Sequence, residues 1–212
     1  MGRTDLIAEM RRHRLVAVVR STSAEEALET AAAAADGGIK FVEITFSVPG
    51  AVQVIAELVK RSDLRVGGGT VLSPDEAQQA IAAGALFIVS PTLELNLVPI
   101  CRAADVACIS GAATPSEIIS AARAGADLVK IFPADCAGGP RFVRQILGPF
   151  PDARLMVSGG VDESNVKEYA ALGVTGICIG SAKLRDSLAK SGRNGLAKYV
   201  RNFVELVEQS ME

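Results

Sequence analysis

Features that mark several other classes of protein are missing from this sequence of 212 residues. It has no tryptophan, aromatic residues make up only 4% of it, and its net charge of −2 is spread without a basic run. This charge pattern does not favour nucleic acid or an anionic membrane as a partner. No stretch approaches the roughly 20 apolar residues of a membrane-spanning helix. The charged first 14 residues also do not resemble a signal peptide.

Histidine and cysteine are too sparse or too scattered for most metal and thiol chemistry. The single histidine, His13, argues against His-ligated metals and His-based catalytic triads. The four cysteines show no CxxC spacing: Cys101, Cys108, Cys136 and Cys178. We interpret them as buried thiols in a reducing cytoplasm. We therefore expect a cytoplasmic protein that uses no metal and no other cofactor.

Short apolar runs alternate with amphipathic helical patterns along the whole chain. The runs that predict strands are Leu15–Arg20, Phe41–Phe46, Arg65–Gly69, Phe87–Ser90, Ala107–Ser110, Leu128–Phe132, Leu155–Ser158 and Ile177–Gly180. No linker divides them, so residues 1–212 are expected to form one α/β domain, a (β/α)₈ TIM barrel with a short N-terminal helix. A doubly wound open sheet is the alternative, but Gly67-Gly68-Gly69-Thr70 lacks the GxGxxG spacing of a dinucleotide site.

Helix boundaries are marked by residues typical of caps. Capping boxes are predicted to begin at Thr22, Ser73 and Thr114. Glycines that end helices and lead into strands are expected at Gly84, Gly125 and Gly173. This recurrence indicates repeated βα units.

A lysine stands in the middle of one predicted strand, in the run Asp127-Leu128-Val129-Lys130-Ile131-Phe132-Pro133. Burying an unpaired ammonium is unfavourable, so a buried amine tends to lose its proton and becomes a nucleophile towards carbonyl carbon. The alternative is a lysine that extends its charge to water from the strand end. Lys130 alone leaves both interpretations open.

A glutamate occupies the same kind of position in Phe41-Val42-Glu43-Ile44-Thr45-Phe46. Glu43 could form a structural ion pair with Lys130 or Arg20. It could also be a general acid/base that works beside the amine. Two ionisable residues inside two apolar strands of one barrel favour the catalytic interpretation.

Glycine-rich segments follow the last two predicted strands. These are Ser158-Gly159-Gly160 and Gly180-Ser181. Barrel enzymes commonly bind phosphate there through backbone N–H groups, so the pair of segments predicts a phosphate site, although tight turns alone would also need glycine. Gly67-Gly68-Gly69-Thr70 after the third strand could let a ligand approach the backbone or could relieve crowding inside the barrel.

Several motifs in this order resemble one family along nearly the whole chain. They are VAVVR (16–20), GGIKFVEITFSVPGA (37–51), VGGGTVLSPDEA (66–77), AGALFIVSP (83–91), LVKIFPAD (128–135), GPFPDARLMVSGGV (148–161) and GICIGSA (176–182). The chain resembles the class I aldolases that act on 2-keto-3-deoxy-6-phosphogluconate (KDPG) and 4-hydroxy-2-oxoglutarate (KHG), grouped with 6-phosphogalactonate aldolases.

The resemblance implies a role for each matching position. Lys130 corresponds to the Schiff-base lysine and Glu43 to the proton-shuttling glutamate. The substrate-binding positions that it implies are Arg20, Thr70, Phe132, Ser158, Gly159, Gly160, Gly180 and Ser181. It also implies a small 2-keto acid as substrate, pyruvate as product and a homotrimer as the assembly.

Three positions depart from the family pattern. Ser47 stands where some members have an arginine that contacts the pyruvate carboxylate, Ser158 stands where many have threonine, and Ser110-Gly111 replaces Pro-Gly. We expect a metal-independent aldolase. The alternatives are a phosphosugar epimerase or isomerase that uses Glu43 as its base, and a non-catalytic barrel that binds a ligand.

Overall fold

The computed structural model describes residues 1–210, and they form a closed barrel of eight parallel strands in sequential order. The strands are β1 (Leu15–Val19), β2 (Phe41–Thr45), β3 (Arg65–Gly69), β4 (Phe87–Val89), β5 (Ala107–Ala112), β6 (Leu128–Ile131), β7 (Leu155–Val157) and β8 (Gly176–Ile179). The barrel closes where Val16 of β1 pairs with Cys178 of β8. This closure confirms the predicted TIM barrel and excludes the open sheet.

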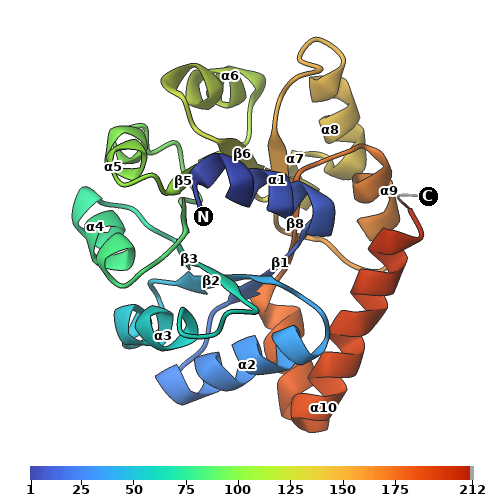
Figure 1. Ribbon diagram of the computed structural model, residues 1–212. Coiled ribbons are helices and arrows are strands. Elements are labelled where there is room, and N and C mark those ends of the chain that lie inside the picture. The colour runs from blue at the N-terminus through green and yellow to red at the C-terminus, as the bar shows by residue number, and fades with distance from the viewer. Residues whose placement is uncertain (211–212) are drawn as a thin grey trace.

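The helices surround the barrel as an outer ring, and α1 crosses one of its ends (Figure 1). They are α1 (Arg3–His13), α2 (Ala24–Asp36), α3 (Ala51–Leu58), α4 (Pro74–Ala82), α5 (Leu97–Ala103), α6 (Pro115–Ala124), α7 (Ala134–Ala137), α8 (Gly139–Leu147), α9 (Val166–Ala171) and α10 (Ser181–Glu208). The short N-terminal helix is therefore confirmed. Among the helices of residues 1–210, none is long and apolar enough to cross a membrane.

The caps that begin the helices follow the sequence closely, with one correction. Thr114 forms the complete capping box with Glu117, and the Ser73 hydroxyl accepts a hydrogen bond from the Glu76 backbone N–H. The box predicted from Thr22 is shifted by one residue. Ser23 is the N-cap and accepts from Glu26, because Thr22 still lies outside the helix and binds the Glu26 carboxylate instead.

The predicted glycines also end their helices. Gly84, Gly125 and Gly173 have φ angles of 96°, 94° and 75°. This left-handed conformation favours glycine, because it lacks a Cβ atom. Each of these turns directs the chain back towards the next strand.

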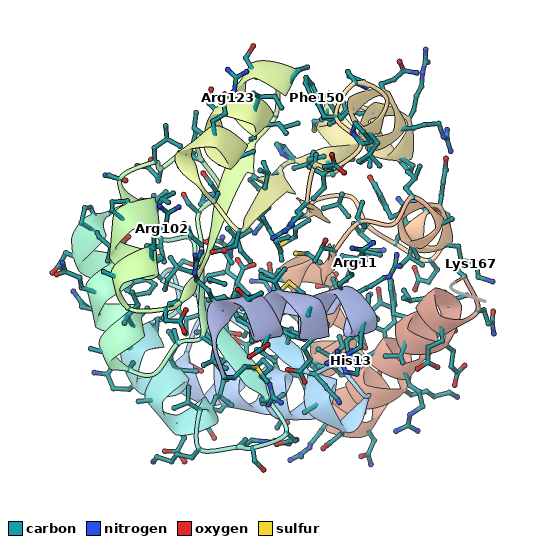
Figure 2. All side chains as sticks on the ribbon, turned by 45° about the horizontal axis from the view of Figure 1, so that its top comes forward. Arg11, His13, Arg102, Arg123, Phe150 and Lys167 are labelled. Carbon is teal, nitrogen blue, oxygen red and sulfur yellow. The ribbon has the colours of Figure 1, made fainter. Side chains whose placement is uncertain are left out.

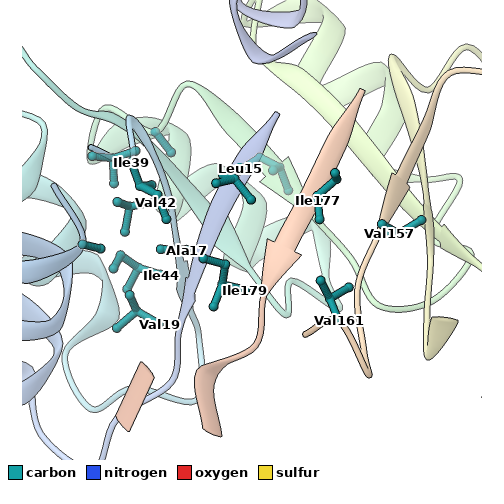
Figure 3. Packing of buried hydrophobic residues seen from close by; sticks show 14 of the residues in the cluster. Leu15, Ala17, Val19, Ile39, Val42, Ile44, Val157, Val161, Ile177 and Ile179 are labelled. Carbon is teal, nitrogen blue, oxygen red and sulfur yellow. The ribbon is translucent and has the colours of Figure 1, made fainter. Parts of the chain in front are cut away.

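Two apolar layers hold the fold together, because successive side chains of a strand point to opposite faces. The outward side chains pack under the helices, as Figure 3 shows for Ala17 and Val19 of β1 and Ile177 and Ile179 of β8. The inward side chains fill the barrel. They include Val16, Val18, Phe41, Phe87, Ile109, Leu128, Met156 and Cys178.

Helix α1 closes the N-terminal end of the barrel. Its side chains Leu6, Ile7 and Met10 belong to the same cluster as the inward side chains of the strands. The Glu9 carboxylate accepts a hydrogen bond of 2.8 Å from Nε of Arg65 at the start of β3. A polar site inside the barrel is therefore confined to the opposite end, where the strands lead into their helices.

Three of the four cysteines are buried, as expected, but Cys136 is exposed. The prediction was wrong for Cys136 because the strand ends at Ile131 and the chain turns into the short helix α7 at the barrel mouth.

Candidate active site

Lys130 and Glu43 meet inside the barrel. Nζ of Lys130, on β6, donates to both carboxylate oxygens of Glu43, on β2, at 3.2 Å each. The residues are only 4% and 1% exposed. The alternative in which Lys130 extends to water is therefore wrong, and the partner of Glu43 is Lys130 rather than Arg20.

The strand pattern explains why both charges point inward. Glu43 lies two residues after the inward Phe41, and Lys130 lies two residues after the inward Leu128. Residues two apart on a strand point to the same face, so both charged side chains point inward. Each charge would be costly alone in an apolar layer, and their mutual hydrogen bonds offset that cost. The ring of Phe132 lies 5.7 Å from Nζ of Lys130, measured to the ring centroid, and is 39% exposed. Phe132 thus borders the pair on the side open to solvent.

The glycines of β3 make room for this arrangement. A Cβ atom on Gly69 would overlap the carboxylate of Glu43, and one on Gly67 would overlap the ring of Phe87. Of the two explanations that the sequence left open, the structure supports relief of crowding. Gly69 on β3 thus leaves the space that the side chain of Glu43, on the neighbouring strand β2, occupies.

Arg20 and Thr70 meet at the mouth of the barrel, after β1 and β3. Nη2 of Arg20 donates to Oγ1 of Thr70 at 3.1 Å. Thr70 has φ +55°, a left-handed conformation that β-branched residues seldom adopt. Such strained residues cluster at functional sites. The exposed guanidinium and the hydroxyl together can bind a carboxylate.

The two glycine-rich segments lie at the same mouth, after β7 and β8. Gly159 and Gly160 have φ of 93° and 68°, and a Cβ atom on Gly160 would overlap Asp135. Gly180 precedes Ser181, the first residue of the long helix α10. The N–H groups at such a helix start attract anions. The segments therefore lie where a phosphate group could bind.

Cys178 lies near the pair, and the sequence pattern assigned no site role to it. Burial raises the pKa of the Cys178 thiol to about 12; Glu43 adds to this, whereas Lys130 and a hydrogen bond with Ser158 oppose it. The thiol is thus uncharged beside the ion pair. The alternation of β8 was the available signal, because it places Cys178 inward together with Gly176 and Gly180.

Other polar residues near the strand ends are engaged elsewhere. Oγ of Ser47 shares a hydrogen bond of 2.8 Å with Oγ1 of Thr45, which in turn donates to the carbonyl of Val19. Ser90 bonds to Thr92. The hydroxyl of Ser110 is buried, and no partner for it exists among residues 1–210; the alternation of β5 turns it towards the helices. These side chains are not brought to Lys130.

No metal-ligand cluster is present in the described part of the chain. Residues 1–210 contain no group of three or more His, Cys, Asp or Glu side chains placed to hold a metal ion. The chemistry that this geometry supports is that of a buried amine beside a carboxyl group. The Arg20–Thr70 contact and the glycine-rich segments after β7 and β8 lie at the mouth of the barrel.

The chain is similar to known proteins in both sequence and fold. The family described as "KDPG and KHG aldolase" matches residues 6–196. The KHG/KDPG aldolase of Escherichia coli K12 is 32% identical over 194 residues, which are 90% of this chain and 91% of that protein.

Solved structures show the same fold. KDPG aldolase from Legionella pneumophila, with pyruvate captured at low pH as a covalent carbinolamine intermediate, matches with a TM-score of 0.83 and 27% identity; the match covers 92% of this chain and 96% of that one. A cube-shaped protein cage designed by fusing symmetric oligomeric domains matches with a TM-score of 0.84 and 27% identity, over 93% of this chain and 73% of that one. The family model matches 191 residues, and this range includes both Lys130 and Glu43. This chain therefore belongs to the KDPG and KHG aldolase family.

Proposed function

We propose that this protein is a class I aldolase that cleaves a 2-keto-3-deoxy-6-phospho sugar acid of the KDPG type, or 4-hydroxy-2-oxoglutarate. The products are pyruvate and an aldehyde such as glyceraldehyde 3-phosphate or glyoxylate. The observation that carries the proposal is the contact between Nζ of Lys130 and the carboxylate of Glu43, deep in an otherwise apolar barrel.

Lys130 is the proposed nucleophile. Passage of a proton from its ammonium to Glu43, across 3.2 Å, leaves an amine that can attack the C2 ketone. Glu43 then protonates the hydroxyl that leaves as water, and an imine remains on Nζ. Because the protonated imine accepts electrons, no metal is required to stabilise the carbanion.

Glu43 also serves the bond cleavage. As a carboxylate, it takes the proton of the C4 hydroxyl while the C3–C4 bond breaks and its electrons pass to the imine. The aldehyde departs, and the remaining enamine is protonated at C3. Water then releases pyruvate and restores Lys130. One carboxyl group beside the amine can perform all of these proton transfers in turn.

The anchors at the mouth orient the substrate for this chemistry. Arg20 and Thr70 are proposed to hold the substrate carboxylate, with Phe132 beside the reacting carbon. Backbone N–H groups of Gly159, Gly160 and Gly180, with the Ser181 hydroxyl, are proposed to hold the distal phosphate, and Ser158 to contact the C4 hydroxyl. Binding energy at both ends can thus align C2 with Lys130.

The relatives support this reaction and the form of the enzyme. The Legionella pneumophila structure shows pyruvate as a carbinolamine, the kind of adduct proposed for Lys130. The designed cage of fused symmetric oligomeric domains supports a symmetric oligomer, and we propose a cytoplasmic homotrimer. The epimerase alternative has no support from the family match.

The test is the release of pyruvate from a panel of purified substrates. KDPG, its galactonate epimer and 4-hydroxy-2-oxoglutarate are supplied to wild-type protein and to Lys130→Met. Pyruvate from at least one substrate, lost in the variant, is expected. Epimerised substrate without pyruvate would replace the proposal with the isomerase, and turnover undiminished in Lys130→Met would remove Lys130 as the nucleophile.

A further inference from the structure

A cavity of about 300 Å³ lies at the N-terminal end of the barrel, opposite the mouth that holds Lys130 and Glu43. It is formed by the end of α1, the connection between α2 and β2, and the last turns of α10. The residues that matter here are Arg12, His13, Lys40, Val204, Val207 and Glu208. Figure 2 shows His13 at the end of α1, on the side towards α10.

The charges around this cavity are unbalanced. Three basic side chains line it, Arg12, His13 and Lys40, against the single carboxylate of Glu208 within residues 1–210. Neither Arg12 nor Lys40 forms an ion pair with another described residue. Arg65 nearby differs, because Glu9 neutralises it. Two cations thus stand at the cavity without a partner of opposite charge in that part of the chain.

The pKa of the His13 imidazole lies below its usual value, first because of burial and then because of this positive charge. Burial lowers its pKa, Lys40 lowers it further, and Arg12 and Arg65 add smaller effects, while Glu9 acts in the opposite direction. The charged groups around it are Glu9 and Arg12 on α1, Lys40 before β2, Arg65 on β3 and Glu208 on α10. An anion placed among them would favour the protonated imidazole.

We infer that this cavity binds a small phosphate ester, with the phosphate held by Arg12, Lys40 and protonated His13. Phosphate oxygens accept charge-assisted hydrogen bonds from such groups. The apolar side chains of Val204 and Val207 on α10 provide a surface for the carbon part of the ligand. Since the cavity and the catalytic pair lie at opposite ends of the barrel, this ligand does not compete with the substrate.

His13 is also the reporter for the test, because it is the single histidine of the chain. Its ring proton is followed by NMR from pH 4.5 to 8 in the unliganded protein, with sulfate as the probe, since sulfate stays dianionic over this range. Sodium chloride of equal ionic strength measures simple screening. We expect sulfate to raise the His13 pKa saturably, by about half a unit or more beyond chloride.

Two lysine variants locate the effect. Lys40→Gln should abolish the additional rise caused by sulfate. Lys60→Gln removes the same charge at the same end of the barrel, where Lys60 already pairs with Glu57 outside the cavity, and should keep the rise. Glu208→Gln should tighten sulfate binding. Equal shifts in sulfate and chloride, a shift that does not saturate, or equal losses in both lysine variants would overturn the proposed site. None of these results depends on aldolase activity.

Discussion

The sequence left two interpretations of Glu43 open. A glutamate in a structural ion pair and a glutamate that transfers protons would occupy the same position. Nζ of Lys130 contacts both of its oxygens, and this geometry serves either role. The difference lies in what a glutamine would do at this position. It keeps the shape and one oxygen that accepts a hydrogen bond from Nζ of Lys130, but it cannot transfer a proton.

We predict that Glu43→Gln lowers kcat by roughly 10²–10⁴-fold while the protein stays folded. The fold survives because glutamine fills the same space and its oxygen still accepts a hydrogen bond from Nζ of Lys130. Melting temperature and kcat are measured on the same preparation. A variant that melts early but retains near wild-type turnover would instead identify a structural pair, whose disruption costs about 3–5 kcal/mol.

The role of Gly69 can also be tested by substitution. Its missing Cβ atom gives the Glu43 carboxylate its space, so Gly69→Ala should displace that carboxylate from Lys130. We expect kcat to fall at least about tenfold, and the free energy of unfolding to fall by about 1–3 kcal/mol from overpacking. Gly148→Ala is the matched control, because its nearest neighbour would lie at 3.5 Å. Equal kcat in both variants would show that Gly69 does not position Glu43.

At the scale of elements, helix starts were more predictable than the exact residue that caps them. Thr114 and Ser73 could be identified from spacing alone. At Thr22-Ser23 two adjacent hydroxyls compete, and sequence cannot decide which one lies at the first turn. The structure assigns that place to Ser23. The predicted strands end within two residues of their observed positions, since the apolar runs that bury each strand also define its length.

The capping box of α6 should have a measurable effect on stability. The Thr114 hydroxyl accepts from the Glu117 N–H, while the Glu117 carboxylate accepts from the N–H of Thr114 and of Ala113. Thr114→Ala should lower the free energy of unfolding by about 1 kcal/mol in urea titrations. Ser116→Ala, two residues along the same exposed turn, should change it by less than about 0.5 kcal/mol. A larger loss in Ser116→Ala would contradict this role.

For the whole molecule, the barrel and its buried lysine–glutamate pair could be predicted from the sequence for one reason. Charged residues inside apolar strands are rare, and the strand period fixes the face to which they point. For Gly67 and Gly69 the sequence left two explanations open, and it could not select relief of crowding because that depends on which side chains meet across the barrel. The position of the Cys178 thiol beside the pair could not be predicted from the sequence for the same reason.

The proposed homotrimer can be tested by its mass in solution. If the protein forms a homotrimer, light scattering coupled to gel filtration should give a mass three times the 22.0 kDa of the chain, without dependence on concentration above the micromolar range. A mass of one or two chains under these conditions would contradict the trimer and would leave the aldolase proposal untouched.

Chemical trapping with pyruvate can show whether Lys130 forms the covalent intermediate. Borohydride added with pyruvate should reduce the imine, and mass spectrometry of the peptides should place one adduct of pyruvate on Lys130. The same treatment of Lys130→Arg, which keeps the positive charge beside Glu43, should give no adduct. An adduct on a different lysine, or none in a preparation that releases pyruvate from its substrate, would contradict the account.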